Sequence, residues 1–368
     1  MKKRILIVGG VAGGASAAAR VRRLDADAEI IMFERGEHVS YSNCCLPYHL
    51  SGTVANSDSL VLMSPETFFK QHEIQVRILS EVTAISTSDK SVTVQNLVDG
   101  TSYTEHYDKL ILSPGASPIL PKSILGIQRP HVFTVRNVRD IRMLKNYIDS
   151  HKIEQAAVIG GGFIGVEVAE NLALAGISVS LVEGAPQIMA PFDYDVVQTL
   201  HKEMMDNGIS LYLSSTLTEV QEDRILIRSK EKTQEIKADL VVMAIGVRPE
   251  TALASAAGLT IGTTGGIWVN HNYQTSDPDI YAVGDAIESF NRILRQPGRL
   301  ALAGPAQKQA RGAADHIYGK TNENTGFIGS SCIRIFGQNA ACTGINERTA
   351  KASGIPCDFA YVYPTDKV

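Results

Sequence analysis

Two stretches of the chain follow the same plan, and this duplication limits the fold more than any other feature of the sequence. Residues 3–36 and residues 154–187 each begin with a short apolar run, pass through a glycine cluster into a segment with Ala and Val at helical spacing, and end in a second apolar run closed by glutamate. This is the order and length of a strand–helix–strand unit. The repeat therefore predicts an α/β fold with two Rossmann-like dinucleotide-binding domains.

The second glycine cluster has the complete dinucleotide-binding pattern. Gly160, Gly162 and Gly165 form GxGxxG, and Glu183 ends the following apolar run. Glycines let the backbone turn tightly and approach a pyrophosphate, the helix start offers unpaired N–H groups, and the acid accepts hydrogen bonds from ribose hydroxyls. We predict a dinucleotide site here, with a Rossmann-like unit that binds no ligand as the alternative.

The first glycine cluster, GGVAGG, departs from this pattern at one position. Gly9 and Gly14 occupy the outer glycine positions and Glu34 closes the second strand, but Val11 stands where the middle glycine is expected. The strand before the cluster and the helix after it still favour a dinucleotide site.

Further strands are predicted after each unit. Residues 107–118 and 238–250 are apolar strands that end in a glycine-containing turn and a proline, and we interpret them as closing strands of the two sheets. Residues 77–97 and 211–231 alternate in polarity around turn residues, which predicts a small antiparallel crossover sheet in each unit.

A late strand within residues 275–289 ends at Gly284 and Asp285. An acid at the carboxyl end of a strand can bind a chain of sugar-like hydroxyls. It can equally cap the helix that follows, so the local pattern leaves both roles open.

Composition excludes several classes of function. The 368 residues carry a net charge of −4 without a run of Lys and Arg, which argues against nucleic acid as a partner. No apolar run is long enough to span a membrane, and the run from Ile5 to Val8 is too short for a signal peptide, so we expect a cytoplasmic protein. The five cysteines show neither CxxC nor metal-ligand spacing, so no metal site is predicted.

With these motifs in order, the chain resembles the pyridine nucleotide-disulfide oxidoreductases, flavoproteins with two dinucleotide sites. The resemblance implies a discontinuous FAD-binding domain (1–118 and 246–322) around an inserted NAD(P)H-binding domain (119–245). It implies FAD contacts at Gly9, Val11, Ala12, Gly14, Glu34, Arg35, Asn43, Val82, Ser113, Gly115, Gly284, Asp285, Ala303 and Pro305. It implies NAD(P)H contacts at Gly160, Gly162, Phe163, Ile164, Gly165, Glu167, Glu183 and Gly246.

Two acids of the second unit are relevant to the binding of the hydride donor, NADH or NADPH. A carboxylate at Glu183 favours free ribose hydroxyls and repels a 2′-phosphate, and the next residues, GAPQ, supply no base, so we predict NADH over NADPH. By the resemblance, Glu167 lies near the nicotinamide; otherwise it is an exposed acid in the first turn of a helix.

The stretch HVSYSNCCLPYHLSG, residues 38–52, contains two adjacent cysteines. A CxxxxC dithiol would need a second cysteine at His49 or Leu50, so the two-thiol mechanism is absent. SYSNCCLPYH resembles the single-cysteine branch of the family, which includes coenzyme A disulfide reductases and NADH-dependent persulfide reductases. Aligned on that pattern, Cys44 is the redox-active residue and Cys45 takes the position of a small residue.

The resemblance implies that hydride passes from NADH to FAD and that Cys44 reduces a low-molecular-weight disulfide or persulfide of the coenzyme A type. The Cys44 thiolate can attack the next disulfide provided that its surroundings depress the pKa of the thiol. A helix start after a loop would help, and the oxidised flavin can accept charge density from the thiolate. Oxygen or peroxide as acceptor, with a sulfenic acid at Cys44, is an alternative, but Ala12 stands where such relatives carry histidine. A third reading is a catalytically impaired FAD-binding redox sensor.

The helix after the first glycine cluster presents Arg20 and Arg23 on one side, a spacing that can hold a phosphate. A solvated basic helix face is the alternative. The resemblance extends the substrate contacts to Ser16, Arg20, Arg23, Ser40, Asn43, His72 and Gln307.

Residues 329–368 predict strand, turn, strand, short helix and strand. They resemble the beginning of the family's C-terminal interface domain, so we expect a partial α+β domain over 323–368 in a C-terminally shortened chain. With the rest of that domain present, we expect a homodimer.

Overall fold

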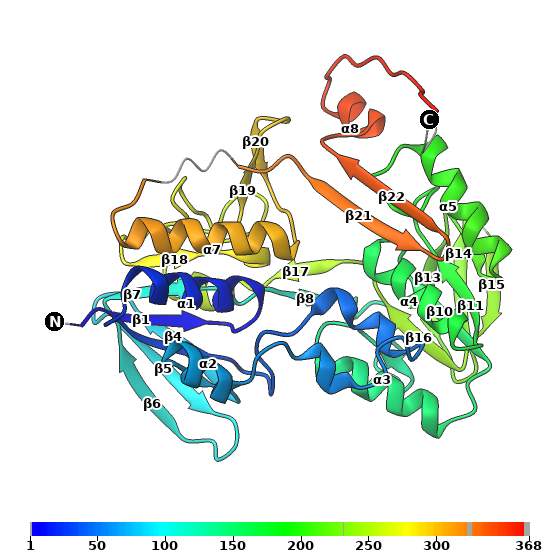
Figure 1. Cartoon of the computed structure of the whole chain (residues 1–368). Helices are drawn as coiled ribbons and strands as arrows, with labels where there is room; N and C mark the ends of the chain where they lie inside the picture. The colour runs from blue at the N-terminus through cyan, green and yellow to red at the C-terminus, as the bar shows by residue number, and fades with distance from the viewer. Residues whose placement is uncertain (1, 231, 322–325, 364–368) are drawn as a thin grey trace, which may run out of the picture.

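A computed structural model describes all residues except 1, 231, 322–325 and 364–368. Two five-stranded parallel sheets form its two lobes, with helices packed on them (Figure 1). The predicted α/β class with two Rossmann-like units is therefore confirmed.

The first sheet has the strand order β18-β7-β1-β2-β3. The apolar runs of its central strands are buried, as expected for a parallel sheet covered on both faces. Its strands are β1 (Arg4–Val8), β2 (Glu29–Phe33), β3 (Ile74–Arg77), β7 (Lys109–Leu112) and β18 (Ile280–Ala282). Its helices are α1 (Ala12–Leu24), α2 (Pro65–His72), α6 (Ala252–Ala256) and α7 (Ala303–Ile317).

The second sheet has the order β12-β11-β10-β16-β9 and repeats the parallel arrangement. Its strands are β9 (Val132–Phe133), β10 (Gln155–Ile159), β11 (Ser178–Val182), β12 (Ser210–Tyr212) and β16 (Leu240–Met243). Its helices are α3 (Val138–Ser150), α4 (Phe163–Leu174) and α5 (Tyr194–Asp206).

Each unit also carries the small antiparallel sheet that the alternating stretches predict. One contains β4 (Ser80–Ser86), β5 (Ser91–Asn96) and β6 (Ser102–His106), and the other contains β13 (Thr216–Val220), β14 (Arg224–Ser229) and β15 (Lys232–Lys237).

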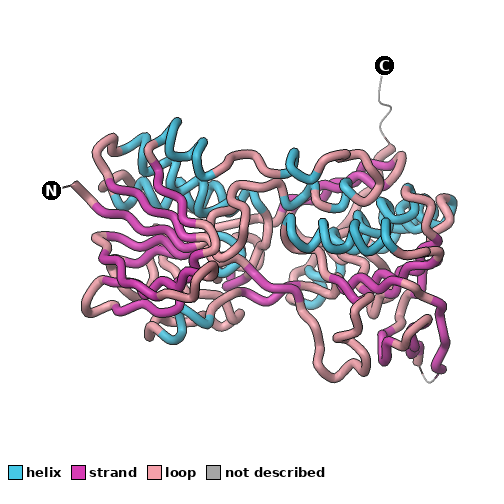
Figure 2. The backbone as a smooth tube through the Cα atoms, turned by 90° about the horizontal axis from the view of Figure 1, so that it is seen from below, coloured by secondary structure: helices cyan, strands magenta, loops and turns pink. Residues whose placement is uncertain are grey.

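The chain crosses between the lobes on two short antiparallel strands, β8 (Ala116–Pro118) and β17 (Val247–Pro249), which lie between the lobes in Figures 1 and 2. A further hairpin near α7 is formed by β19 (Ser289–Asn291) and β20 (Gln296–Gly298).

The C-terminal segment contains β21 (Ser330–Ile335), β22 (Gln338–Thr343) and α8 (Glu347–Ala352). It packs on the second unit: the Phe336 N–H donates to Glu170 Oε1 at 2.6 Å, and Asn346 caps α8 while donating to the Ala190 carbonyl at 3.0 Å. The predicted final strand is wrong for residues 355–363, which are almost entirely exposed and pair with no strand in the part of the chain that the structure describes. An extended segment needs such a partner to satisfy its backbone as a strand.

The hydrophobic core of the second unit extends into a segment that belongs to the first half of the sequence. Leu46, Leu50 and Leu60 are buried in the same apolar cluster as Val166 and Leu172 of α4. The segment that follows Cys44 is therefore fixed by the second unit. In the part of the chain that the structure describes, no helix has the length and apolar character needed to cross a membrane.

Candidate active site

The first glycine cluster forms a tight turn between β1 and α1. Gly9 has φ +91°, a conformation that favours glycine, and a Cβ on Gly14 would lie 1.8 Å from the Gly9 carbonyl oxygen. Both outer glycines are therefore required by the backbone. Val11, which precedes α1, has φ −99° and is compatible with a side chain.

The second cluster repeats this geometry. Gly160 has φ +110°, and a Cβ on Gly165 would lie 1.9 Å from the Gly160 carbonyl oxygen. At the middle position, Gly162 has φ −81°, and a Cβ on this residue would have no heavy atom within 4 Å. The presence of Val11 in place of glycine in the first unit thus needs no change of backbone.

The two strand-ending acids hold their glycine turns in the same way. Glu34 accepts hydrogen bonds from the N–H groups of Gly10 and Gly36 at 2.9 and 2.8 Å. Glu183 accepts them from Gly161 and Ala185 at 2.6 and 2.7 Å. Both turns therefore present a carboxylate beside backbone N–H groups at a helix start, which is the arrangement a dinucleotide requires.

Asp285 lies in the short 3₁₀ turn η4 (Gly284–Ala286), beyond the end of β18. Burial raises its pKa, and the nearby positive charge of Arg136 opposes this. Arg136 also lies 3.7 Å from Glu250 and donates to Ser117 Oγ at 3.3 Å, and its carbonyl accepts from Asn43 Nδ2 at 3.2 Å.

Arg136 is a residue that the sequence analysis missed. It comes from the second unit, between β9 and α3, and meets groups that are distant in the sequence. Its local pattern, an arginine before a helix capped by Asn137, carries no signal of this position.

The loop of residues 41–61, called the redox loop for the role that the sequence predicts for Cys44, starts beside the first glycine turn. The Ser40 N–H donates to the Gly10 carbonyl at 2.8 Å, and Ser40 has φ +48°. Cys44 follows in η1 (Asn43–Cys45), is exposed, and is a free thiol. Its side chain is therefore accessible to solvent, in a loop that starts at the first glycine turn.

The position of the distal cysteine in a CxxxxC motif is filled by a histidine with a structural contact. His49 lies in η2 (Pro47–His49), and its Nδ1 is 2.8 Å from the Val54 carbonyl. Cys45 packs against the apolar core of the second unit. The adjacent thiols of Cys44 and Cys45 thus lie in different surroundings.

The protein groups around Cys44 do not depress the pKa of its thiol. Desolvation by neighbouring groups raises the pKa of this partly exposed thiol, and the nearby carboxylate of Glu167 raises it further. A three-residue 3₁₀ turn is too short to supply the dipole of an α-helix, so no opposing effect of that kind operates here.

Glu167, on α4, is the acid that faces this region from the second unit. Burial and the charge of Glu170 raise its pKa to about 7. Its carbonyl accepts from Asn171 Nδ2 at 2.8 Å, and Asn171 Oδ1 accepts from Ser51 at 2.7 Å, so α4 is held against the redox loop. The Glu167 carboxyl group is therefore partly protonated near neutral pH, and the helix that carries it is held in place beside the loop.

A cavity of about 370 Å³ lies between α4, the redox loop and β21. Its lining includes Tyr48, Glu167, Cys332 and Arg334. The last two come from the C-terminal hairpin, which sequence reasoning did not connect with the site.

The predicted substrate residues are only partly brought together. Ser16, Arg20 and Arg23 lie on α1, but Arg20 is bound to Asp315 of α7 at 2.6 Å. Ser40 and Asn43 flank the start of the redox loop. Gln307 is exposed on α7, and His72 ends α2.

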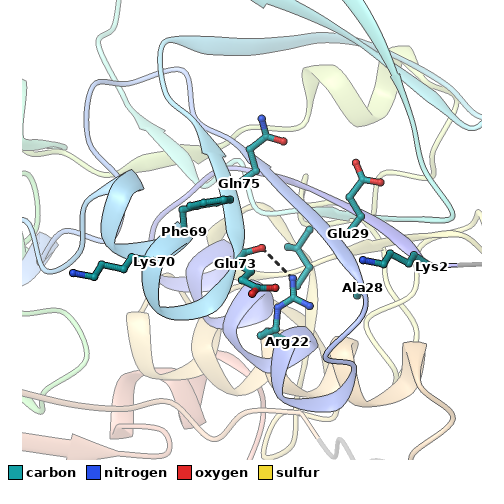
Figure 3. A pocket seen from close by; sticks show the side chains of 9 residues that line it. Lys2, Arg22, Ala28, Glu29, Phe69, Lys70, Glu73 and Gln75 are labelled. Carbon is teal, nitrogen blue, oxygen red and sulfur yellow. Dashed lines mark hydrogen bonds between the residues drawn. The ribbon is translucent and has the colours of Figure 1, made fainter.

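A second cavity, of about 530 Å³, lies away from Cys44, at the end of the first sheet where β2 begins (Figure 3). Arg22 reaches the carbonyls of His72 and Glu73 there, at 2.8 and 3.0 Å. This guanidinium joins α1 to the end of α2, so we assign it a structural role.

The other predicted cofactor residues have the following environments. Val82 is buried in β4, Arg35 pairs with Glu250 at 2.9 Å, and Gly115 and Gly246 adopt positive φ at the two crossover strands. Ser113 lies next to Gly13 and Gly284. Three helices begin with the remaining residues: Ala12 begins α1, Phe163 and Ile164 begin α4, and Ala303 and Pro305 lie in the first turn of α7.

Comparison with known proteins agrees with this geometry. The chain is 33% identical over 344 residues to the coenzyme A disulfide reductase of Staphylococcus haemolyticus, covering 93% of this chain and 77% of that protein. It is 32% identical over 349 residues to the enzyme of the same name from Staphylococcus aureus, covering 95% and 78%.

Among solved structures, the reduced CoADR-RHD of Bacillus anthracis matches with a TM-score of 0.94 and 43% identity, over 97% of this chain and 64% of that one. The NAD-dependent persulfide reductase of A. fulgidus matches with a TM-score of 0.91 and 31% identity, over 95% and 66%. The chain thus spans just under two thirds of the length of these two proteins. Residues 3–310 match the family described as pyridine nucleotide-disulphide oxidoreductase, and the chain belongs to that family.

Proposed function

We propose that the chain uses NADH and FAD to reduce coenzyme A disulfide, coenzyme A persulfide or a similar low-molecular-weight disulfide through Cys44. The observation that carries this proposal is the exposed free thiol of Cys44, in a loop that is bound to the first glycine turn through Ser40 and whose expected second redox position is His49. The named relatives support the substrate class.

The proposal assigns FAD to the first unit and NADH to the second. Positive-φ Gly9, the close approach of Gly14 and the Glu34 carboxylate fit a dinucleotide, and Asp285 with Arg136 suits its polar chain. Bound FAD supplies the transfer of two electrons between NADH and sulfur. The discontinuous first domain (1–118 and 246–322) is supported by the late strand β18, which joins the first sheet. The cytoplasmic location and the homodimer stay predictions.

Cys44 acts as the nucleophile in this scheme. Its thiolate attacks one sulfur of the substrate disulfide, forming a mixed disulfide and releasing the other half as a thiolate. Two electrons from NADH and one proton then cleave the mixed disulfide. This step regenerates the Cys44 thiolate and releases the second half of the substrate as a thiol. Because the pKa of Cys44 is raised, the thiolate fraction and the rate of attack should increase with pH through the neutral range.

The test is anaerobic turnover of the FAD-loaded chain with NADH and coenzyme A disulfide, measured as thiol released. We expect one NADH consumed per disulfide cleaved, and a loss of at least about 1,000-fold in Cys44→Ser, since a hydroxyl cannot form the mixed disulfide. Cys45→Ala is the matched control and should keep most of its activity. Equal loss in both variants, or faster turnover with peroxide or oxygen than with the disulfide, would overturn the proposal.

A further inference from the structure

The C-terminal hairpin and helix α8 pack on the second unit through contacts that the proposed chemistry does not use. Ile333 and Ile335 of β21 are buried in the apolar core of that unit. The Phe336 N–H, in the turn of the hairpin, donates to Glu170 of α4 at 2.6 Å. The segment is therefore held as part of the second lobe, along which it lies in Figure 1.

The start of α8 contacts the loop of residues 184–193, which joins β11 to α5. Asn346 is buried, and its Nδ2 donates to the carbonyls of Ala190 and Phe192 at 3.0 and 3.1 Å. Arg348 Nη2 donates to the Ala190 carbonyl at 2.8 Å. Two side chains at the start of α8 thus bind the backbone of this loop directly.

The same loop supports the second glycine turn. The Met189 N–H donates to the Gly161 carbonyl at 2.7 Å, and a Cβ on Gly161 would lie 2.7 Å from Ile188 Cγ2. Met189 is fully buried and has φ +49°, a left-handed conformation that a residue other than glycine keeps only where its surroundings hold it. The Phe192 N–H donates to the Met189 carbonyl at 3.0 Å. A series of hydrogen bonds therefore connects Asn346, through Phe192 and Met189, to the glycine turn.

We propose that the C-terminal segment is part of the NADH site, and that Asn346 and Arg348 are positioning residues that hold the second glycine turn through the loop of residues 184–193. The inference rests on the proposed function, which assigns NADH to this turn. A dinucleotide binds such a turn through its backbone, so the groups that fix the backbone influence affinity without touching the ligand. The expected effect is therefore on the binding of NADH and not on the hydride transfer that follows.

Asn346→Asp tests the amide donors without removing the helix cap. Asn346 Oδ1 accepts from the Thr349 N–H at 3.0 Å, and aspartate caps a helix as well as asparagine does, but its carboxylate cannot donate to the two carbonyls. In anaerobic flavin reduction by NADH, we expect the Kd of NADH to rise about fivefold or more and the limiting rate to stay within twofold. The FAD content and the KM for coenzyme A disulfide should stay unchanged. A parallel rise in that KM would indicate a general loss of structure and would contradict the proposal.

Arg348→Gln should have a smaller effect, because Asn346 still donates to the Ala190 carbonyl in this variant. We expect the Kd of NADH to rise about two- to threefold. Lys351→Gln is the matched control, since it removes the same charge from an exposed residue of the same helix. Equal changes in the two variants would show that the charge of α8 governs the affinity, and would overturn the role of Arg348.

Hydrogen exchange of the whole FAD-loaded chain measures the positioning without turnover. Asn346→Asp should speed exchange in peptides that contain residues 158–163 and 184–193, and should leave residues 6–14, in the first unit, unchanged. This result supports the positioning even if no disulfide is reduced, in which case the proposed function fails alone. Unchanged exchange in both segments, or an unchanged Kd of NADH in a variant of a protein that reduces the disulfide, overturns the positioning alone.

Discussion

The two glycine turns have nearly the same backbone geometry but serve helices of different character. Each turn has a positive-φ glycine, a second glycine in contact with its carbonyl, and an acid that accepts two backbone N–H groups. The helix of the first turn, α1, carries arginines along its exposed side. The helix of the second, α4, is apolar apart from a few polar residues, and its acid Glu167 faces the redox loop.

This difference shows which parts of the motif are fixed and which are free. The outer glycines and the acid determine the turn, and they are the same in both units. The middle position tolerates Val11 because its φ is negative in both turns. The two helices, by contrast, differ: α1 has a basic surface, whereas α4 has an acid, Glu167, that faces the redox loop.

The largest effect is expected at the outer glycines. Gly14→Ala and Gly165→Ala each place a methyl group less than 2 Å from a backbone carbonyl, so each should destabilise its unit by about 3 kcal/mol or more. Gly14→Ala should lose FAD, whereas Gly165→Ala should retain FAD and lose NADH-dependent reduction. Denaturant unfolding and flavin absorbance measure both. The same loss of FAD from both variants would show that the units are not independent.

Removal of either strand-ending acid should affect one cofactor and leave the other unchanged, with a smaller effect than substitution of the outer glycines. Each accepts two hydrogen bonds as a carboxylate, so its removal leaves two N–H groups unpaired. Glu183→Ala should raise KM for NADH about tenfold and reduce the preference over NADPH, with FAD content unchanged. Glu34→Ala should lower FAD affinity without altering the nucleotide preference. Stronger discrimination against NADPH in Glu183→Ala would contradict the assigned role.

Glu167→Gln tests whether α4 influences Cys44 electrostatically. Ionised Glu167 raises the pKa of the thiol, so the variant should form thiolate at lower pH and its rate should rise earlier on the pH axis. Because Glu167 titrates at about 7, the two proteins should agree well below neutral pH and differ above it. Thiolate absorbance and pre-steady-state disulfide cleavage follow the effect, and Glu222→Gln on the β13–β14 turn is the control. If thiolate formation in Glu167→Gln required a higher pH than in the unaltered protein, the proposed electrostatic effect of Glu167 on Cys44 would be refuted.

The smallest effect is expected at Gly162→Val, which copies the first turn into the second. The Cβ of the added side chain meets no heavy atom within 4 Å and the φ is allowed, so the free energy of unfolding should change by less than about 1 kcal/mol. Equilibrium denaturation of the variant measures this change, and a loss as large as that of Gly165→Ala would show that the middle glycine is a structural requirement.

Much of the fold could be predicted because its signals are local. Apolar runs such as Ile5–Val8 lie next to turns whose glycines the backbone demands, and the repeat of that pattern predicted both sheets. The final strand was wrong because strand formation depends on a partner, and residues 355–363 pair with none of the described strands. The raised pKa of Cys44 had no signal in the sequence, because it depends on Glu167, which is distant in the sequence.

The sequence by itself determined the two dinucleotide turns, because backbone conformation and short spacings decide them. Its resemblance to the single-cysteine branch of the family predicted Cys44 as the redox residue. Only the tertiary structure showed that Arg20 is occupied by Asp315, that Arg136 reaches the Asp285 region, and that Cys45 packs into the core of the second unit. These contacts join segments separated by up to about 300 residues. Charge and packing act through space, so their partners are fixed only when the chain is folded.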